Sequence, residues 1–167
     1  MASAGQCSYT ACPGWKQGAE VHRSELFDVS NEIVLVTGGG SGLGLAMARA
    51  LAANGAKIAL ADNDKASLET AVTTIVAMGG QAIAVALDVR CDEAICQAFD
   101  KVEAALGPVS VLINNAGIAH RDKATHLERD TIRDVLSINV DSVLIVAQEA
   151  ARRMIRDGRG GSIINIS

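Results

Sequence analysis

Thr37-Gly38-Gly39-Gly40-Ser41-Gly42-Leu43-Gly44 is the stretch of sequence that decides the fold. An aliphatic run at 33–36 precedes it and indicates a buried strand, and the Ala- and Leu-rich segment 45–51 after it predicts a helix. The glycines allow turns that are closed to other residues, and they let the backbone approach a ligand because no Cβ is in the way. A helix that starts at such a turn points its N-terminal amides at the same place, which suits a pyrophosphate.

The spacing of these glycines excludes two common phosphate-binding loops. The strict Gly-x-Gly-x-x-Gly pattern fails, since its last position is Leu43 when counted from Gly38 and Leu45 when counted from Gly40. A Walker-type loop fails too, because no Lys follows Gly44. The pattern that is present is Thr-Gly-x-x-x-Gly-x-Gly. Taken alone it is a weak signal, since glycine turns also serve as plain connectors.

Length and composition favour one α/β domain. The 167 residues are 49% hydrophobic but only 2% aromatic, so the core must be built from Val, Ile, Leu and Ala. Aliphatic strands that are buried on both faces are typical of a parallel sheet. The formal net charge of −4 gives no electrostatic footprint for nucleic acid. No apolar run approaches the roughly 20 residues of a membrane span.

The N-terminus and the cysteines favour a cytoplasmic protein. The N-terminus has no basic region followed by an apolar core, so it does not resemble a secretory signal. The four cysteines lack Cys-x-x-Cys spacing, so no metal site is expected; they are Cys7, Cys12, Cys91 and Cys96. We expect Cys91 and Cys96 to be small buried or half-buried thiols in a reduced compartment.

Hydrophobic periodicity predicts five strands joined by four helical crossovers. Residues 1–24 are rich in Ala, Gly, Ser and Gln without periodicity, and we interpret them as a disordered extension before a domain at 25–167. Leu26 and Phe27 are expected to pack against the sheet edge. The expected strands are 33–36, 57–61, 82–87, 109–113 and 162–166, and the expected helices are 45–54, 65–78, 92–106 and 130–156. Right-handed crossovers then give a doubly wound parallel sheet of order 3-2-1-4-5.

Candidate ligand-binding residues stand where the predicted strands end. The glycine turn follows the first strand, Asp62 ends the second, Asp88 follows the third and Asn115 follows the fourth. Each has an ordinary alternative: a helix cap for Asp62, a turn for Asp88, and a left-handed turn pair for Asn114 and Asn115. Ligands of open α/β sheets bind outside the carboxyl ends of the strands. Since four signals meet at that edge, the sequence predicts a ligand crevice there.

Residues 26–167 resemble the short-chain dehydrogenase/reductase family. The matching pieces are the stretch 37–44, Asp62, Asp88-Val89, Asn114-Asn115-Ala116-Gly117, and Asn139 within Ser137-Ile138-Asn139-Val140. The resemblance implies a Rossmann-like, NAD-binding domain at 25–167. It also implies an oxidoreductase that moves a hydride between a nicotinamide and a small-molecule secondary alcohol or ketone. A homo-oligomer is the implied assembly, with the helix at 130–156 contributing to subunit contacts.

The resemblance assigns the crevice to the cofactor. The positions implied to bind it are Gly38, Ser41, Gly42, Leu43, Gly44, Asp62, Asp88, Val89, Asn115, Ala116 and Gly117. Asp62 would bind the adenosine ribose hydroxyls, which predicts NAD over NADP, because a carboxylate repels a 2′-phosphate and no Arg sits beside it. Asp88 and Val89 would contact the adenine. The remaining residues would line the pyrophosphate and nicotinamide sides.

The catalytic positions of the family match only in part. Asn139 matches the asparagine that holds a water in a proton relay. The family's Tyr-x-x-x-Lys has no counterpart, because the only tyrosine is Tyr9 and Pro13 stands where its Lys would be. Ser167 lies one residue before the expected catalytic Ser. We therefore expect the cofactor-binding part of an enzyme; the alternative is an inactive dinucleotide-binding or subunit-interaction fragment.

Other polar or exposed features are weaker candidates. His120 and His126 lie in the polar loop 118–129, and a lone loop histidine is usually just solvated. Four arginines are interpreted as a solvated face that complements the dipole of the last helix, namely Arg152, Arg153, Arg156 and Arg159. The strand 162–166 is short, aliphatic and uncharged, so we expect it to be an aggregation-prone edge.

Overall fold

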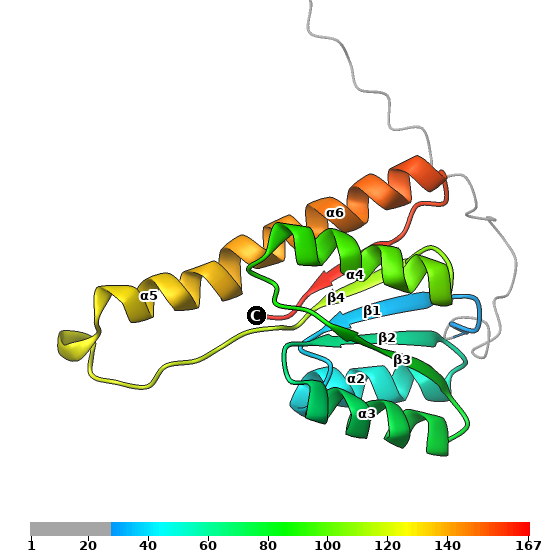
Figure 1. Cartoon of the computed structure of the whole chain (residues 1–167), viewed down its shortest axis with the longest axis horizontal. Helices are drawn as coiled ribbons and strands as arrows, with labels where there is room; N and C mark the ends of the chain where they lie inside the picture. The colour runs from blue at the N-terminus through cyan, green and yellow to red at the C-terminus, as the bar shows by residue number, and fades with distance from the viewer. Residues whose placement is uncertain (1–27) are drawn as a thin grey trace, which may run out of the picture.

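A parallel five-stranded sheet lies between helices on its two faces (Figure 1). The computed structural model describes residues 28–167, so the expectations for residues 1–24, Leu26 and Phe27 lie outside the described residues. The strands are β1 (Ile33–Thr37), β2 (Lys57–Asp62), β3 (Gln81–Ala86), β4 (Val111–Asn114) and β5 (Ser162–Asn165). They pair in parallel in the order β3-β2-β1-β4-β5, which confirms the predicted doubly wound sheet.

The helices form two layers. They are α2 (Gly42–Ala53), α3 (Lys65–Ala77), α4 (Asp92–Ala105), α5 (Arg129–Leu136) and α6 (Ser142–Asp157), with a short 3-10 turn η1 (Ala124–His126). In Figure 1, α2 and α3 cover one face of the sheet, and α4 and α6 cover the other. The element bounds differ from the expected ones by only a few residues, apart from the last helix.

The core is aliphatic on both faces of the sheet, as the composition predicts. Successive residues of a strand point to opposite faces. Leu35 therefore joins the core under α4 and α6, which surrounds Phe99, while Val34 and Val36 join the core over α2 and α3. All four side chains are almost completely buried. This double burial holds the carboxyl ends of the strands rigidly at one edge, where the candidate site lies.

The expected continuous helix at 130–156 is wrong in one respect. Between α5 and α6 the backbone forms a π-helical segment η2 (Ser137–Asp141). The Ser142 N–H donates to the Ser137 carbonyl five residues back, and the Ser142 hydroxyl donates to the Ile138 carbonyl at 2.6 Å. Single π turns inside helices occur frequently at functional sites. The apolar spacing of the sequence continues across η2, so that spacing does not reveal the π turn.

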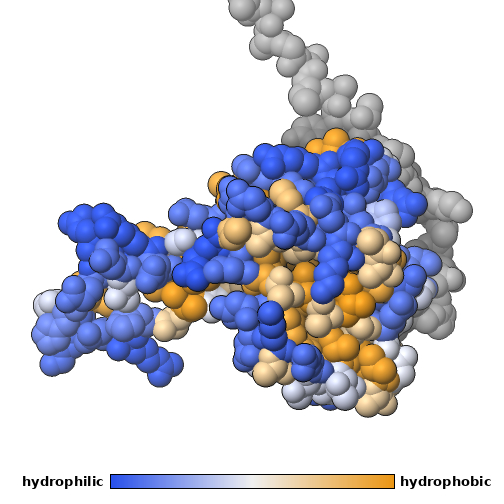
Figure 2. Space-filling view, in the orientation of Figure 1, coloured by the Kyte–Doolittle hydropathy of each residue, from blue (hydrophilic) through white to orange (hydrophobic). Residues whose placement is uncertain are grey.

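The loop 115–128 and α5 extend away from the sheet (Figure 1). Four apolar side chains on α5, η2 and α6 recur at a spacing of four residues and stay 44–59% exposed; they are Ile132, Leu136, Val140 and Leu144, hereafter the apolar stripe. Figure 2 shows the visible face of this extension as largely hydrophilic, with hydrophobic residues near its junction with the body. The apolar side chains of α5, η2 and α6 therefore include an exposed set as well as the residues that pack on the sheet.

Arg153 corrects the expectation that the arginines of the last helix are solvated. Its side chain is only 10% exposed and forms ion pairs with Glu149 at 2.6 Å, Asp100 at 2.8 Å and Glu103 at 3.2 Å. Its guanidinium carbon also lies 5.3 Å from the ring centre of Phe99. Burial acts to lower the pKa of Arg153, but the hydrogen bonds that it donates to these carboxylates raise that pKa above its ordinary value. The cluster ties α6 to α4.

Cys91 and Cys96 are exposed free thiols, so the expectation of buried or half-buried cysteines is wrong. Both lie at the solvent side of the first turns of α4, where the core takes Ile95 and Phe99 instead. In residues 28–167 no helix has the length and apolarity needed to cross a membrane. The same residues contain no cluster of three or more His, Cys, Asp or Glu that could hold a metal ion.

Candidate cofactor-binding site

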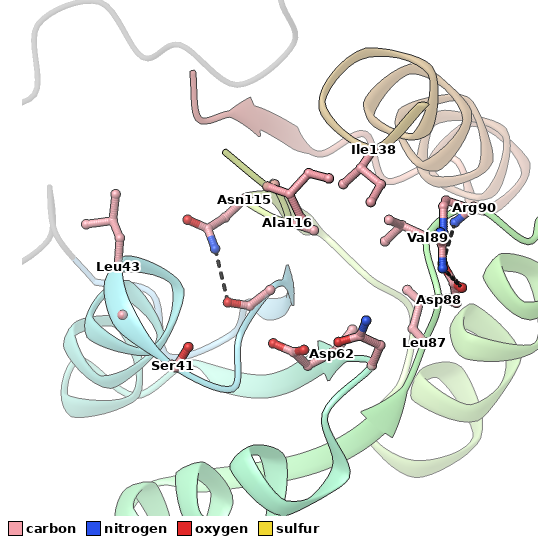
Figure 3. A pocket seen from close by; sticks show the side chains of 16 residues that line it. Ser41, Leu43, Asp62, Leu87, Asp88, Val89, Arg90, Asn115, Ala116 and Ile138 are labelled. Carbon is pink, nitrogen blue, oxygen red and sulfur yellow. Dashed lines mark hydrogen bonds and ion pairs between the residues drawn. The ribbon is translucent and has the colours of Figure 1, made fainter. Parts of the chain in front are cut away.

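A cavity of about 370 Å³ opens at the carboxyl ends of β1, β2, β3 and β4. Its wall contains ten of the eleven residues predicted to bind the cofactor: Gly38, Ser41, Gly42, Leu43, Asp62, Asp88, Val89, Asn115, Ala116 and Gly117. In Figure 3, Ser41 and Leu43 lie at one side of this cavity and Asp88 at the opposite side, with Asp62 between them. The predicted crevice therefore exists as a single space.

The glycine turn shapes one side of the cavity. Gly38 and Gly42 have φ values of 62° and 53°, a left-handed conformation that favours glycine. A Cβ on Gly42 would meet nothing within 4 Å, so this backbone faces open space. Ser41 precedes α2 as its N-cap without a side-chain capping bond, so it leaves the first amides of the helix available. Such a helix N-terminus is a ready anion site.

Gly44, the eleventh predicted residue, acts behind the turn and does not line the cavity. A Cβ there would lie 2.3 Å from the Gly38 carbonyl oxygen and 2.6 Å from Asn115 Nδ2. Glycine is therefore required for the close packing of α2 against the turn. Its contribution to the site is indirect, because it sets where the Gly38 backbone runs.

Thr37 and Asn115 fasten the turn to the end of β4. The amide of Asn115 donates to the Thr37 and Gly38 carbonyls, both at 3.1 Å. In return, the buried Thr37 hydroxyl accepts the backbone N–H groups of Asn115 at 3.0 Å and Ala116 at 3.1 Å. Asn115 has an ordinary backbone conformation, since no residue other than glycine has a positive φ among those described. The alternative of a left-handed turn pair is therefore wrong for Asn114 and Asn115.

Asp62 is held by backbone amides at the end of β2. Its Oδ2 accepts the Gly40 N–H at 3.1 Å, and its Oδ1 accepts the Asp64 N–H at 3.2 Å. Each carboxylate oxygen keeps a further lone pair for a ligand. The helix cap that was the alternative for Asp62 is supplied by Asp64, which accepts the N–H groups of Ala66 and Ser67 at the start of α3. Hydrogen bonds from Ser67 lower the pKa of Asp64.

Asp88 carries a partner that sequence reasoning missed. Arg90 Nε donates to Asp88 Oδ1 at 3.0 Å, and Arg90 Nη2 donates to Oδ2 at 2.7 Å. These side-chain hydrogen bonds lower the pKa of Asp88. Asp88 also opens a turn, since its carbonyl accepts the Cys91 N–H. The sequence signal that could have revealed this pair is an arginine two residues after a strand-end aspartate. Arg90 also lines the cavity.

Asn139 lies in η2, beside the cavity and outside its wall. Its Oδ1 accepts the Ile118 N–H and its Nδ2 donates to the Ile118 carbonyl, both at 2.9 Å. Asn139 and Ile118 line a second cavity of about 360 Å³ that also includes His120, and Ile118 lines both cavities. His126 lines neither, and its Nδ1 lies 3.8 Å from Asp122 Oδ1. The structure therefore brings Asn139 next to the crevice and leaves His126 apart from it.

These features define a Rossmann-type α/β domain with its ligand crevice at the strand ends where such domains bind nucleotides. The family model described as short chain dehydrogenase matches residues 32–167. The chain belongs to this family, whose members use NAD or NADP.

Relatives and solved structures agree with this assignment. Gluconate 5-dehydrogenase of Gluconobacter oxydans (strain 621H) is 38% identical over 142 residues, which are 85% of this chain and 55% of that protein. The 5-keto-D-gluconate 5-reductase of Escherichia coli (strain K12) is 33% identical over 143 residues, 86% of this chain and 56% of that protein. A short-chain type dehydrogenase/reductase from Mycobacterium marinum matches with a TM-score of 0.82 and 31% identity, over 84% of this chain and 57% of that one. The chain thus spans little more than half the length of these relatives.

Proposed function

We propose that this chain is the cofactor-binding part of an NAD-dependent oxidoreductase that acts on a secondary alcohol or ketone of a sugar acid. One observation carries the proposal: the open backbone at Gly42 and the amide-held carboxylate of Asp62 face the same 370 Å³ cavity. A dinucleotide needs both an anion site and a ribose-hydroxyl acceptor. The substrate class is taken from the relatives named for gluconate and 5-keto-D-gluconate.

The residues present fit a dinucleotide. The turn would hold the pyrophosphate, because the backbone at Gly42 faces open space with no side chain between it and a ligand. Asp62 would accept the ribose hydroxyls, and Gly117 with Ala116 would line the nicotinamide side. When bound, the nicotinamide supplies the hydride chemistry, and the protein binds and orients it. Asp62 favours NAD, because its carboxylate would repel the 2′-phosphate of NADP. Arg90, the cation of this cavity wall, is paired with Asp88 and is therefore not free to offset that repulsion.

The proposal assigns Asn139 to positioning. Both polar atoms of its amide bond to the Ile118 backbone, so its side chain holds η2 against the loop that follows β4. A relay water would then bond to the backbone of this segment, where the π turn shifts the ordinary helical pairing. Proton exchange with a substrate needs a Tyr–Lys pair, which residues 28–167 do not contain. General acid–base help contributes about 10²–10⁴-fold, so we expect no turnover above background from the 167 residues alone.

The test is a calorimetric titration of the purified chain with NAD and NADP, followed by an NADH assay on a panel of sugar acids. We expect NAD to bind at least about tenfold more tightly, because a 2′-phosphate would meet the Asp62 carboxylate. Asp62→Asn removes this charge and should narrow the gap. Asp130→Asn is the matched control, since Asp130 is an exposed carboxylate on α5 that pairs with Arg133 away from the cavity. Equal or tighter binding of NADP would contradict the assignment, and strong NADH production would contradict the expected lack of turnover.

The apolar stripe favours a second candidate function, a subunit-interaction surface. Exposed apolar side chains that line up on one face mark protein contacts more often than scattered ones do. Leu144 is 59% exposed and Val140 is 55% exposed at the same face. In this proposal the chain associates with a second copy through α5 and α6. The two functions are compatible, because the stripe does not contribute to the wall of the 370 Å³ cavity.

A further inference from the structure

Arg90 is the one cation among the described residues that line the 370 Å³ cavity. It follows β3 in the loop before α4. In Figure 3, Arg90 and Asp88 lie together at the side of the cavity opposite Ser41 and Leu43, near Val89 and Ile138. The glycine turn and Arg90 therefore bound the two ends of the same space.

The side chain of Arg90 is held in one orientation. Two of its nitrogens bond to the two Asp88 oxygens, at 3.0 Å and 2.7 Å, so the guanidinium and the carboxylate meet as a fork. The Arg90 backbone N–H donates to the same Oδ1 at 3.0 Å. The other charged group that acts on Arg90 is Asp134 of α5. With side-chain exposures of 47% for Arg90 and 43% for Asp88, such a pair contributes little to stability.

Among the described residues, the cavity wall contains no aromatic side chain on which a nucleotide base could stack. The planar guanidinium of Arg90 is therefore the side chain of this wall that is suited to stacking. A guanidinium is planar and weakly hydrated, and it stacks on aromatic faces. Its fork with Asp88 removes most of the rotamer freedom that stacking would otherwise cost. Val89 and Ile138 add apolar surface at the same side of the wall.

We propose that Arg90 is a cofactor-binding residue whose guanidinium, held flat by Asp88, stacks on the adenine ring of the bound dinucleotide. The inference rests on the proposed function, since it takes a dinucleotide as the ligand of this cavity. It adds a residue and a role to that function: Arg90 recognises the flat face of the base, and Asp88 is the residue that positions Arg90.

The test compares Arg90→Ala and Arg90→Lys by calorimetric titration of the chain with NAD and, separately, with AMP, which carries the adenine without the nicotinamide. Losing a base–side-chain stack weakens binding by about tenfold, and we expect this loss for both ligands in Arg90→Ala. Arg90→Lys keeps the charge and loses the plane, so it should stay within about threefold of Arg90→Ala. Arg133→Ala is the matched control, because Arg133 also forms an exposed pair with an aspartate and does not line the cavity.

The remaining outcomes of these titrations distinguish failure of the inference from failure of the proposed function. Wild-type affinity for NAD and AMP in Arg90→Ala, with an unchanged melting temperature, overturns the inference while the proposed dinucleotide site stands. Full recovery by Arg90→Lys also overturns it, since charge alone would then explain the effect. A wild-type chain that binds neither NAD nor AMP overturns the proposed function and the inference together.

Discussion

Gly44→Ala tests the packing that shapes the glycine turn. The added Cβ would lie 2.3 Å from the Gly38 carbonyl oxygen, whereas ordinary contacts begin at 3.4 Å. The Gly38 oxygen is a backbone atom and cannot rotate away, so α2 and the turn would have to separate by about 1 Å. That movement stretches the two 3.1 Å hydrogen bonds from the Asn115 amide to the Thr37 and Gly38 carbonyls.

The expected loss of stability follows from these contacts. Overpacking costs about 1–3 kcal/mol, and each weakened hydrogen bond adds about 1 kcal/mol. Alanine in place of glycine returns about 1 kcal/mol through its helix propensity. The net loss is therefore about 2–4 kcal/mol, which lowers the melting temperature of a domain of this size by about 10 °C.

The assay is thermal and urea unfolding followed by circular dichroism, with Gly117→Ala as the matched control. A Cβ on Gly117 would lie at an ordinary 3.4 Å from Asn139 Oδ1, so this variant should stay within about 0.5 kcal/mol of the wild type. If Gly44→Ala melts within a degree or two of Gly117→Ala, the steric reasoning is refuted and the turn is more adaptable than the contacts indicate.

Two further predictions concern α6. Arg153→Met should lower the free energy of unfolding by about 2–3 kcal/mol, because it leaves Glu149, Glu103 and Asp100 without their shared cation. The control is Arg156→Met, which should leave the melting temperature nearly unchanged because the Arg156 side chain is 55% exposed. Equal melting temperatures for the two variants would contradict the role of the Arg153 cluster. Leu144→Glu places a charge in the apolar stripe and should shift the chain from dimer to monomer in light scattering, whereas Ile155→Glu, at an exposed apolar residue of α6 outside the stripe, should not. A wild-type monomer would count against the interaction surface.

The fold was readable from the sequence because its signals are local. An aliphatic run, a glycine turn and an amphipathic segment follow one another within about one strand and one helix, and the periodicity of 2 or 3.6 residues distinguishes them. The same patterning places Asp62, Asp88 and Asn115 at strand ends. Once the strands are parallel, those ends must meet at one edge of the sheet, which is why the predicted crevice and ten of its residues line a single cavity.

The errors arose where packing and hydrogen bonds, which residue type alone does not specify, decide the outcome. Arg153 is buried because Asp100 and Glu103 of α4 lie beside it, more than 45 residues away in the sequence. The Cys91 and Cys96 thiols are exposed because other residues of α4 fill the core. The π turn at η2 is stabilised by a Ser142 hydroxyl bond and by the Asn139 amide on Ile118, and neither changes the apolar spacing.

The sequence by itself determined the strand order, the position of the glycine turn and the acidic residues at the strand ends, because backbone preference and hydrophobic period act over a few residues. Tertiary structure alone decided that Asn115 braces the turn, that Arg90 lines the same cavity as the glycine turn, and that the apolar stripe remains exposed. These outcomes depend on which side chains meet across the assembled sheet. Hydrogen bonds and ion pairs form only between side chains that the fold brings together, and residue type at a given spacing does not specify those neighbours.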